Sequence, residues 1–191
     1  MRKLVAIALL FSATTARPDT CAVPSTTGYV SNDGTTVVRI EFGRPKAYSP
    51  DPKDCVARIA RWHEEDSSYR FVRSVVLRNP IGPGEAVISN DGRFFATFDD
   101  FCQAGMTENA VVIYDLENGT VVACGIEDFL PKKYRETLHR SISNINWGDQ
   151  PYLNDEDRKI WIGPPRDSNA NLSVVIDLNT SSITLWPPQS E

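Results

Sequence analysis

The stretch SNDGRFFATFD, from Ser89 to Asp99, joins a tight-turn signal to a run of β-forming residues. Asp-Gly between β-rich runs predicts a hairpin, because glycine tolerates the positive φ that tight turns require. The same tetrapeptide, SNDG, occurs at Ser31 to Gly34, ahead of the strand-like run TTVVRIEF at Thr35 to Phe42. A looser copy, LNDEDRKIWI at Leu153 to Ile162, has Asp157 in place of the glycine. The repetition predicts three hairpins of one kind.

Each of these hairpins is followed by a second pair of strand-like runs. The pairs are Cys55 to Trp62 with Tyr69 to Leu77, Ala110 to Leu116 with Thr120 to Cys124, and Leu172 to Leu178 with Ser182 to Trp186. We therefore predict an all-β fold of three four-stranded antiparallel units, at about residues 28–79, 86–147 and 151–186. The 191-residue chain is long enough for one core, and residues 28–191 are expected to form a single domain.

The second unit carries a recognisable motif. Ser89-Asn90-Asp91-Gly92-Arg93, followed by VVIYD at Val111 to Asp115 and by Asn118-Gly119, resembles one blade of a bacterial secreted or periplasmic β-propeller-like repeat protein. In such repeats an S-x-D-G-[RK] turn joins two inner strands. The match is good in the second unit, partial in the third, and has a different outer turn in the first. The resemblance implies a propeller-like fold that binds through its loops, and it carries no catalytic residue.

The number of units departs from that family. Propellers close with about four to eight blades, whereas this chain supplies three units. Three alternatives follow: a homodimer that closes a six-unit ring, a three-sheet assembly that closes differently, or an overcount of units. One helical insert could also cover an open side. The run IEDFLPKKYRETLHR at Ile126 to Arg140 predicts one short helix with Asp128 as N-cap and Pro131 at an early position.

The N-terminus predicts export. Arg2 and Lys3 precede the apolar run LVAIALLF at Leu4 to Phe11, and SATTA at Ser12 to Ala16 supplies small residues for cleavage. Residues 1–16 therefore read as a signal peptide cleaved near Ala16, followed by an N-terminal segment, residues 17–27. We expect a secreted or periplasmic protein, and no later run is long enough to span a membrane.

Four cysteines remain after such cleavage, and an even number in an exported chain predicts two disulfides. They are Cys21, Cys55, Cys102 and Cys124. Three pairings are open. We favour Cys102 with Cys124, which closes a loop of about twenty residues, and Cys21 with Cys55.

Charge and motifs limit the function. There are 20 Lys plus Arg against 25 Asp plus Glu, and the net charge of −5 argues against a nucleic-acid binder. The sequence has no Cys-x-x-Cys pair, P-loop, Gly-x-Gly-x-x-Gly, Gly-x-Ser-x-Gly or His-Glu-x-x-His motif. We expect no cofactor and no bound metal, and the chain is more readily read as a non-enzyme than as an enzyme.

A short set of polar and aromatic residues forms the candidate binding surface. They lie at or beside two loops, residues 102–109 and 147–152, and are Asp99, Asp100, Glu108, Trp147, Asp149 and Tyr152. Two adjacent aspartates after a strand, with Glu108, could hold a hard cation, although loop solvation is the more ordinary role. Trp147 is the tryptophan expected to be most exposed.

We therefore predict a non-catalytic binding or scaffolding module for a protein, peptide or envelope component. One alternative is a hydrolytic, carbohydrate-active enzyme that pairs Asp99 or Asp100 with His63 or His139. Another is a self-assembling, adhesin-like structural protein.

Overall fold

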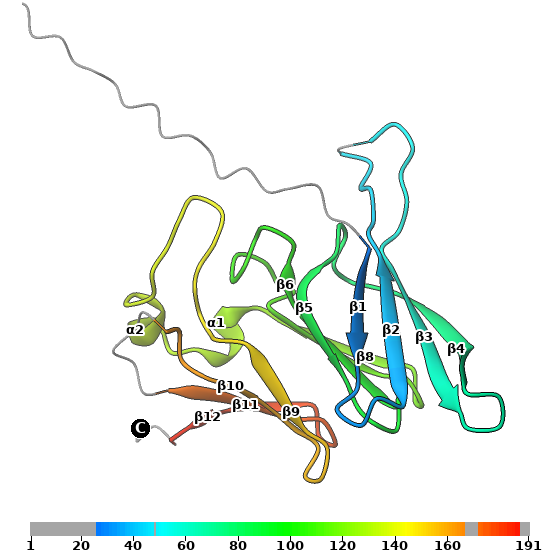
Figure 1. Ribbon diagram of the computed structural model, residues 1–191. Coiled ribbons are helices and arrows are strands. Elements are labelled where there is room, and N and C mark those ends of the chain that lie inside the picture. The colour runs from blue at the N-terminus through cyan, green and yellow to red at the C-terminus, as the bar shows by residue number, and fades with distance from the viewer. Residues whose placement is uncertain (1–25, 48, 167–171, 188–191) are drawn as a thin grey trace, which may run out of the picture.

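The computed structural model describes residues 26–47, 49–166 and 172–187. In this part of the chain, twelve strands form three antiparallel sheets of four strands each, every sheet in simple chain order (Figure 1). The first sheet contains β1 Thr27–Val30, β2 Thr36–Glu41, β3 Val56–His63 and β4 Ser68–Val76. The second contains β5 Pro83–Ile88, β6 Phe94–Asp100, β7 Val111–Asp115 and β8 Thr120–Cys124. The third contains β9 Pro151–Asn154, β10 Lys159–Ile162, β11 Ser173–Asp177 and β12 Ser182–Trp186. The predicted propeller-like, all-β fold of three four-stranded units is confirmed.

The second sheet is buried on both faces, and this explains its continuous apolar runs. In β6, Phe94 and Phe98 belong to a core cluster shared with the third sheet, whereas Phe95 belongs to one shared with the first sheet. Adjacent residues of a strand point to opposite faces. A strand between two cores must therefore be mainly apolar on both of its faces. The run FFATF is so, and its one polar residue, Thr97, donates its hydroxyl to Asn79. The two clusters are separate, so the second sheet is the centre of the molecule.

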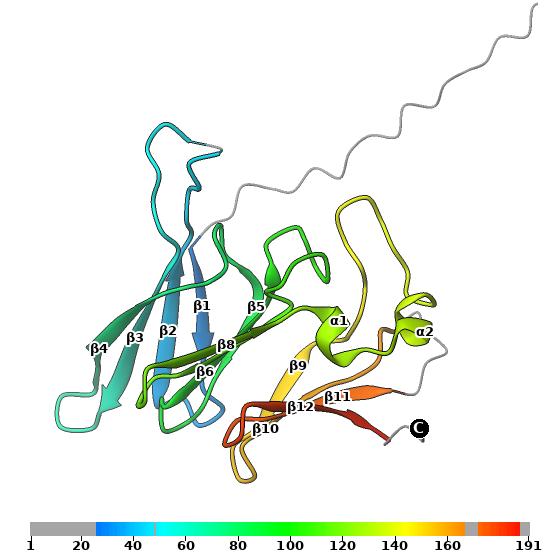
Figure 2. The same ribbon diagram turned by 180° about the vertical axis from the view of Figure 1, so that it is seen from behind.

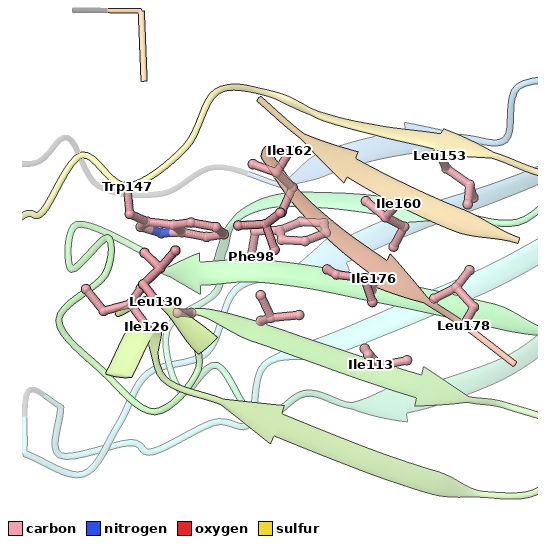
Figure 3. Close-up of a cluster of buried hydrophobic side chains, with 14 of the residues drawn as sticks. Phe98, Ile113, Ile126, Leu130, Trp147, Leu153, Ile160, Ile162, Ile176 and Leu178 are labelled. Carbon is pink, nitrogen blue, oxygen red and sulfur yellow. The ribbon is translucent and has the colours of Figure 1, made fainter. Parts of the chain in front are cut away.

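The third sheet turns its alternate residues toward that centre. Leu153, Ile160 and Ile176 lie side by side across β9, β10 and β11 and are all at most 4% exposed. Figure 3 shows this row facing Ile113 of β7. The opposite face carries Tyr152, which is 62% exposed.

The three repeat turns meet at one end of the strands and bond directly to one another. Asn90 donates its backbone N–H to Asp155 Oδ1 (2.8 Å), and its side-chain oxygen accepts the N–H of Asp33 (3.1 Å). Asn32 Nδ2 donates to Leu153 O (2.8 Å) and to Asp155 Oδ2 (3.1 Å). The first and third units are thus joined directly at this end. A six-unit ring of two chains would have to break those bonds, and the homodimer stays a prediction.

The tetrapeptide recurs because each copy makes the same local bonds. Ser31 Oγ donates to Asp33 Oδ1 (2.7 Å), and in the second copy Ser89 Oγ donates to Asp91 Oδ1 (2.6 Å). The glycine of each copy has a positive φ of 67–75°. In the third turn the positive φ falls on Arg158 (54°) rather than on Asp157.

The helical insert differs from the single predicted helix. It holds two helices of four residues, α1 Ile126–Phe129 and α2 Lys132–Arg135. Leu130 between them is extended (φ −95°, ψ 125°), because a residue before proline disfavours the helical region. Asp128 is not the N-cap, although its Oδ2 accepts the N–H of Gly125, which is the N-cap of α1 (2.8 Å).

Both expected disulfide pairings are wrong. Cys55 and Cys124 are free thiols. Cys55 is buried in the core between the first and second sheets, and Cys124 ends β8, two strands away from the β6 strand that leads to Cys102. Cys102 is disulfide-bonded, and the remaining cysteine, Cys21, lies outside the described residues, as does the expected signal peptide.

This arrangement predicts two reactive thiols among the cysteines of the described residues. Under denaturing, non-reducing conditions a maleimide should label Cys55 and Cys124 but not Cys102. In the folded protein Cys124 should react first, because burial removes Cys55 from solvent and raises its pKa to about 11. Peptide mapping by mass spectrometry checks both statements, and a label on Cys102 without reduction contradicts the arrangement.

No helix among the described residues is long and apolar enough to cross a membrane.

Candidate binding cleft at the loop end

The loops of the candidate surface lie at the end of the strands opposite the repeat turns. Figures 1 and 2 show the segment after β6 and the segment before β9 rising together at that end. Ile145 N–H donates to Ala104 O (2.7 Å), and Ala104 N–H donates to Asn144 Oδ1 (3.0 Å). Two loops that are about forty residues apart in sequence are therefore fixed as one surface.

Asp99 holds these two loops together. Its Oδ1 accepts the N–H of Gly105 (2.7 Å), and the indole Nε1–H of Trp147 lies 2.9 Å from Oδ1 and 3.0 Å from Oδ2. Burial raises the pKa of Asp99 to about 7, against the effect of the hydrogen bonds from Gly105 and Trp147, which favour the charged form. The carboxyl group therefore changes charge near neutral pH.

Trp147 is buried, contrary to expectation, with 5% of its surface exposed. Its ring packs edge-to-face on Phe129 of α1 at 5.5 Å between centroids, and Figure 3 shows it beside Leu130 at one end of the core cluster. Glycine at position 105 leaves room for the indole ring, because a Cβ there would lie only 3.0 Å from Trp147 Cδ1. Trp147 forms one wall of the site and is not an exposed platform.

A cleft of about 440 Å³ opens beside this pair, between the second and third sheets. Its polar lining consists of Glu85, Asp99, Asp149, Gln150 and Arg166. Arg166 Nε donates to both carboxylate oxygens of Asp149 (3.2 and 3.0 Å), which holds the pKa of that carboxyl below its usual value. Glu85 has no ion pair with any described residue. The cleft is therefore acidic, with three carboxyl groups and one guanidinium.

The structure does not bring the other predicted residues to this cleft. Asp100 points into a buried network, where it accepts bonds from Asn79 Nδ2 (3.0 Å) and Asn109 Nδ2 (3.1 Å). Glu108 is exposed and pairs with Arg78 at 3.4 Å. Tyr152 lies on the far face of the third sheet. No group of three or more metal-ligating side chains occurs among the described residues.

The histidines of the hydrolase alternative lie elsewhere. His63 ends β3 and lines a hollow with Asp33 and Asn90 at the turn end. His139 is exposed in the segment after α2. Neither is among the hydrogen-bond partners of Asp99.

Two residues of the cleft were missed by sequence reasoning. Glu85 stands in the middle of the inner strand β5, opposite Phe98 in the ladder. The sequence signal that could have indicated Glu85 is a single acidic residue in a strand that leads to an SNDG turn. Arg166 follows two prolines in a loop and gives no signal of its own.

The comparisons with known proteins find no family for this chain and only weak structural neighbours. No family model matches the chain and no curated protein matches it. A Bacteroides fragilis protein assigned as a 6-phosphogluconolactonase shares 16% identity at a TM-score of 0.42, over 84% of this chain and 37% of its own. The hydrazine synthase of Kuenenia stuttgartiensis shares 17% identity at a TM-score of 0.36, over 80% of this chain and 39% of its own. This chain spans less than two-fifths of either protein. The class that can be stated is an all-β, propeller-like protein.

Proposed function

We propose that this protein is an exported, non-catalytic binding module that holds a basic side chain of a peptide or protein partner in the loop-end cleft. The observation that carries the proposal is the acidic lining of that cleft. Glu85 has no basic partner among the residues that the structure describes, and Asp99 adds a second negative charge above about pH 7. A guanidinium or ammonium group is the ligand that complements such a lining.

The construction of the cleft supports binding, because its walls are fixed before a ligand arrives. Asp99 connects the loop at Gly105 to Trp147, and Trp147 packs on the core. A preformed site loses little conformational freedom on binding. Its volume of about 440 Å³ is ample for one long side chain.

Export rests on the sequence of residues 1–16, and the disulfide at Cys102 supports it because disulfides persist in oxidising compartments.

The hydrolytic alternative has one observation in its favour, the raised pKa of Asp99, which would suit a general acid near neutral pH. Against it, both oxygens of Asp99 already accept bonds from Trp147, and no histidine accompanies it. Turnover of nitrophenyl glycosides or esters that disappears in Asp99→Asn would favour the enzyme instead.

Titration calorimetry with a matched peptide pair tests the binding proposal. The probes are acetyl-Gly-Ala-Arg-Ala-Gly-amide and the same peptide with citrulline, which has nearly the same shape and no charge. We expect the arginine peptide to bind at least about tenfold more tightly, a difference of roughly 1.4 kcal/mol. Glu85→Gln should remove most of that preference.

Glu108→Gln is the matched control, because it makes the same charge change on an exposed carboxylate at the same end of the molecule. It should bind the arginine peptide like the wild type. Equal affinity for the two peptides, or equal losses in the two variants, contradicts the proposal.

A further inference from the structure

A second hollow lies at the opposite end of the strands, between the first and second sheets. Its volume is about 410 Å³, and its polar lining brings together residues of all three units. They are Arg61, Arg73, Asp91, Arg93, Glu117 and Arg158. Four guanidinium groups around one hollow are unexpected in a chain whose net charge is −5.

Two of these arginines are held in place by acidic partners. Arg93 Nη2 contacts Asp115 Oδ2 at 2.9 Å, and its Nε contacts Glu117 Oε2 at 3.1 Å. Arg158 Nη2 contacts Asp91 Oδ2 at 2.8 Å. Both guanidinium groups also lie over the Phe94 ring, at 4.6 and 5.5 Å from its centroid. The acidic side chains of the hollow are therefore already paired.

The other two arginines have donors to spare. Arg73 Nη1 donates to the backbone oxygen of Leu116, and no carboxylate of the described residues pairs with this side chain. Arg61, on the neighbouring strand β3, has neither an ion pair nor a hydrogen bond from its side chain to any described residue. The Arg61 side chain lies against the second repeat turn, because a Cβ on Gly92 would be 3.9 Å from Arg61 Cδ.

Arg61 and Arg73 are exposed, and apolar side chains line the hollow beside them. Ile59, Val72 and Leu116 line it beside the arginines, and Leu116 is only 8% exposed. An ion pair is stronger next to apolar walls than on open surface, because the local dielectric is lower. Guanidinium groups bind carboxylate and phosphate oxygens through paired N–H donors.

We propose that this hollow is a binding site for a small molecule that carries an oxyanion, a phosphate or a carboxylate group, with Arg61 and Arg73 as its principal donors. A volume of about 410 Å³ lies within the range of small-molecule sites. The site takes an anion at the turn end, whereas the acidic cleft takes a cation at the loop end, so each stands independently of the other.

Titration calorimetry tests the site with two probes, inorganic pyrophosphate and citrate, each at an ionic strength matched with sodium chloride. Matching removes the general screening effect that any salt has on surface charges. We expect saturable binding of at least one probe, and the tighter of the two identifies the phosphate or the carboxylate source. Arg61→Gln should weaken it by about tenfold, the equivalent of roughly 1.4 kcal/mol.

Arg39→Gln is the matched control. Arg39 is exposed on β2 of the same sheet, on the face directed away from the hollow, and the substitution removes the same charge. It should leave the affinity unchanged, as should Glu85→Gln at the other end of the molecule. Absence of saturable binding for both probes, or equal weakening in Arg61→Gln and Arg39→Gln, overturns the proposal.

Discussion

Replacing Asp99 by asparagine is expected to abolish a loss of stability that the wild type suffers between pH 5 and pH 8. Burial raises the pKa of Asp99 to about 7 in the folded protein. Between about pH 4 and pH 7 the folded chain therefore keeps a proton that the unfolded chain has released. The contribution of Asp99 to the free energy of unfolding therefore falls as the pH rises through 7. From pH 5 to pH 8 the fall amounts to roughly 2–3 kcal/mol, at about 1.4 kcal/mol per pKa unit.

Asparagine suits the position in other respects. Asp99 has a φ of 56°, a conformation that asparagine tolerates better than most residues. Its side-chain oxygen can still accept the bonds from Gly105 and Trp147. Relative to the wild type, Asp99→Asn should gain stability with increasing pH, measured as urea midpoints at pH 5, 6, 7 and 8. A constant difference across these pH values would show that Asp99 does not titrate in this range.

The second large effect is expected at Asp100, the neighbouring carboxylate. Asp100→Ala should lower the free energy of unfolding by about 2–4 kcal/mol, because it strands the buried amide donors of Asn79 and Asn109. Asn79 is fully buried, and its Oδ1 accepts the hydroxyl of Thr97 (2.8 Å). Loss of Asp100 therefore disturbs a network that ties the segment after β4 to β6.

Urea denaturation at one pH measures this loss, with Glu108→Ala as control. Glu108 is exposed, so its truncation should change stability by no more than about 0.5 kcal/mol. At a temperature where Asp100→Ala remains folded, it should bind the arginine peptide like the wild type. A change in stability as small as that of the control, or a selective loss of peptide binding, would place Asp100 in a binding site instead.

The turns, the strands and the break between the helices can be predicted from the sequence because they depend on residues that are close together in the chain. In each SNDG turn the serine, aspartate and glycine interact within five residues, so the tetrapeptide is sufficient to locate it. The β-forming residues of the flanking runs then predict the strands. The break between α1 and α2 is equally local, because it follows from Pro131, although a proline near the start of a helix is also compatible with one helix.

The part that could not be predicted depends on contacts between distant segments. The burial of Trp147 requires Asp99, 48 residues earlier, and close approach at Gly105. The acidity of the cleft requires Glu85 from β5 beside Asp99 from β6. Asp99 and Asp100 look equivalent in sequence, but the left-handed φ of Asp99 (56°) breaks the alternation of β6. Phe98 and Asp99 therefore both line the cleft, whereas Asp100 enters the buried network with Asn79 and Asn109.

The most direct test of the proposed function follows the four tryptophan indole signals in ¹H–¹⁵N spectra while the arginine peptide is added. The Trp147 indole N–H bonds to Asp99 at the wall of the cleft, so its signal should shift saturably at pH 8 and less at pH 5.5, where Asp99 is protonated. Trp62, Trp161 and Trp186 should stay unchanged. A peptide that binds while the Trp147 signal stays still, or that shifts Trp161 and Trp186 instead, would contradict a binding site in this cleft.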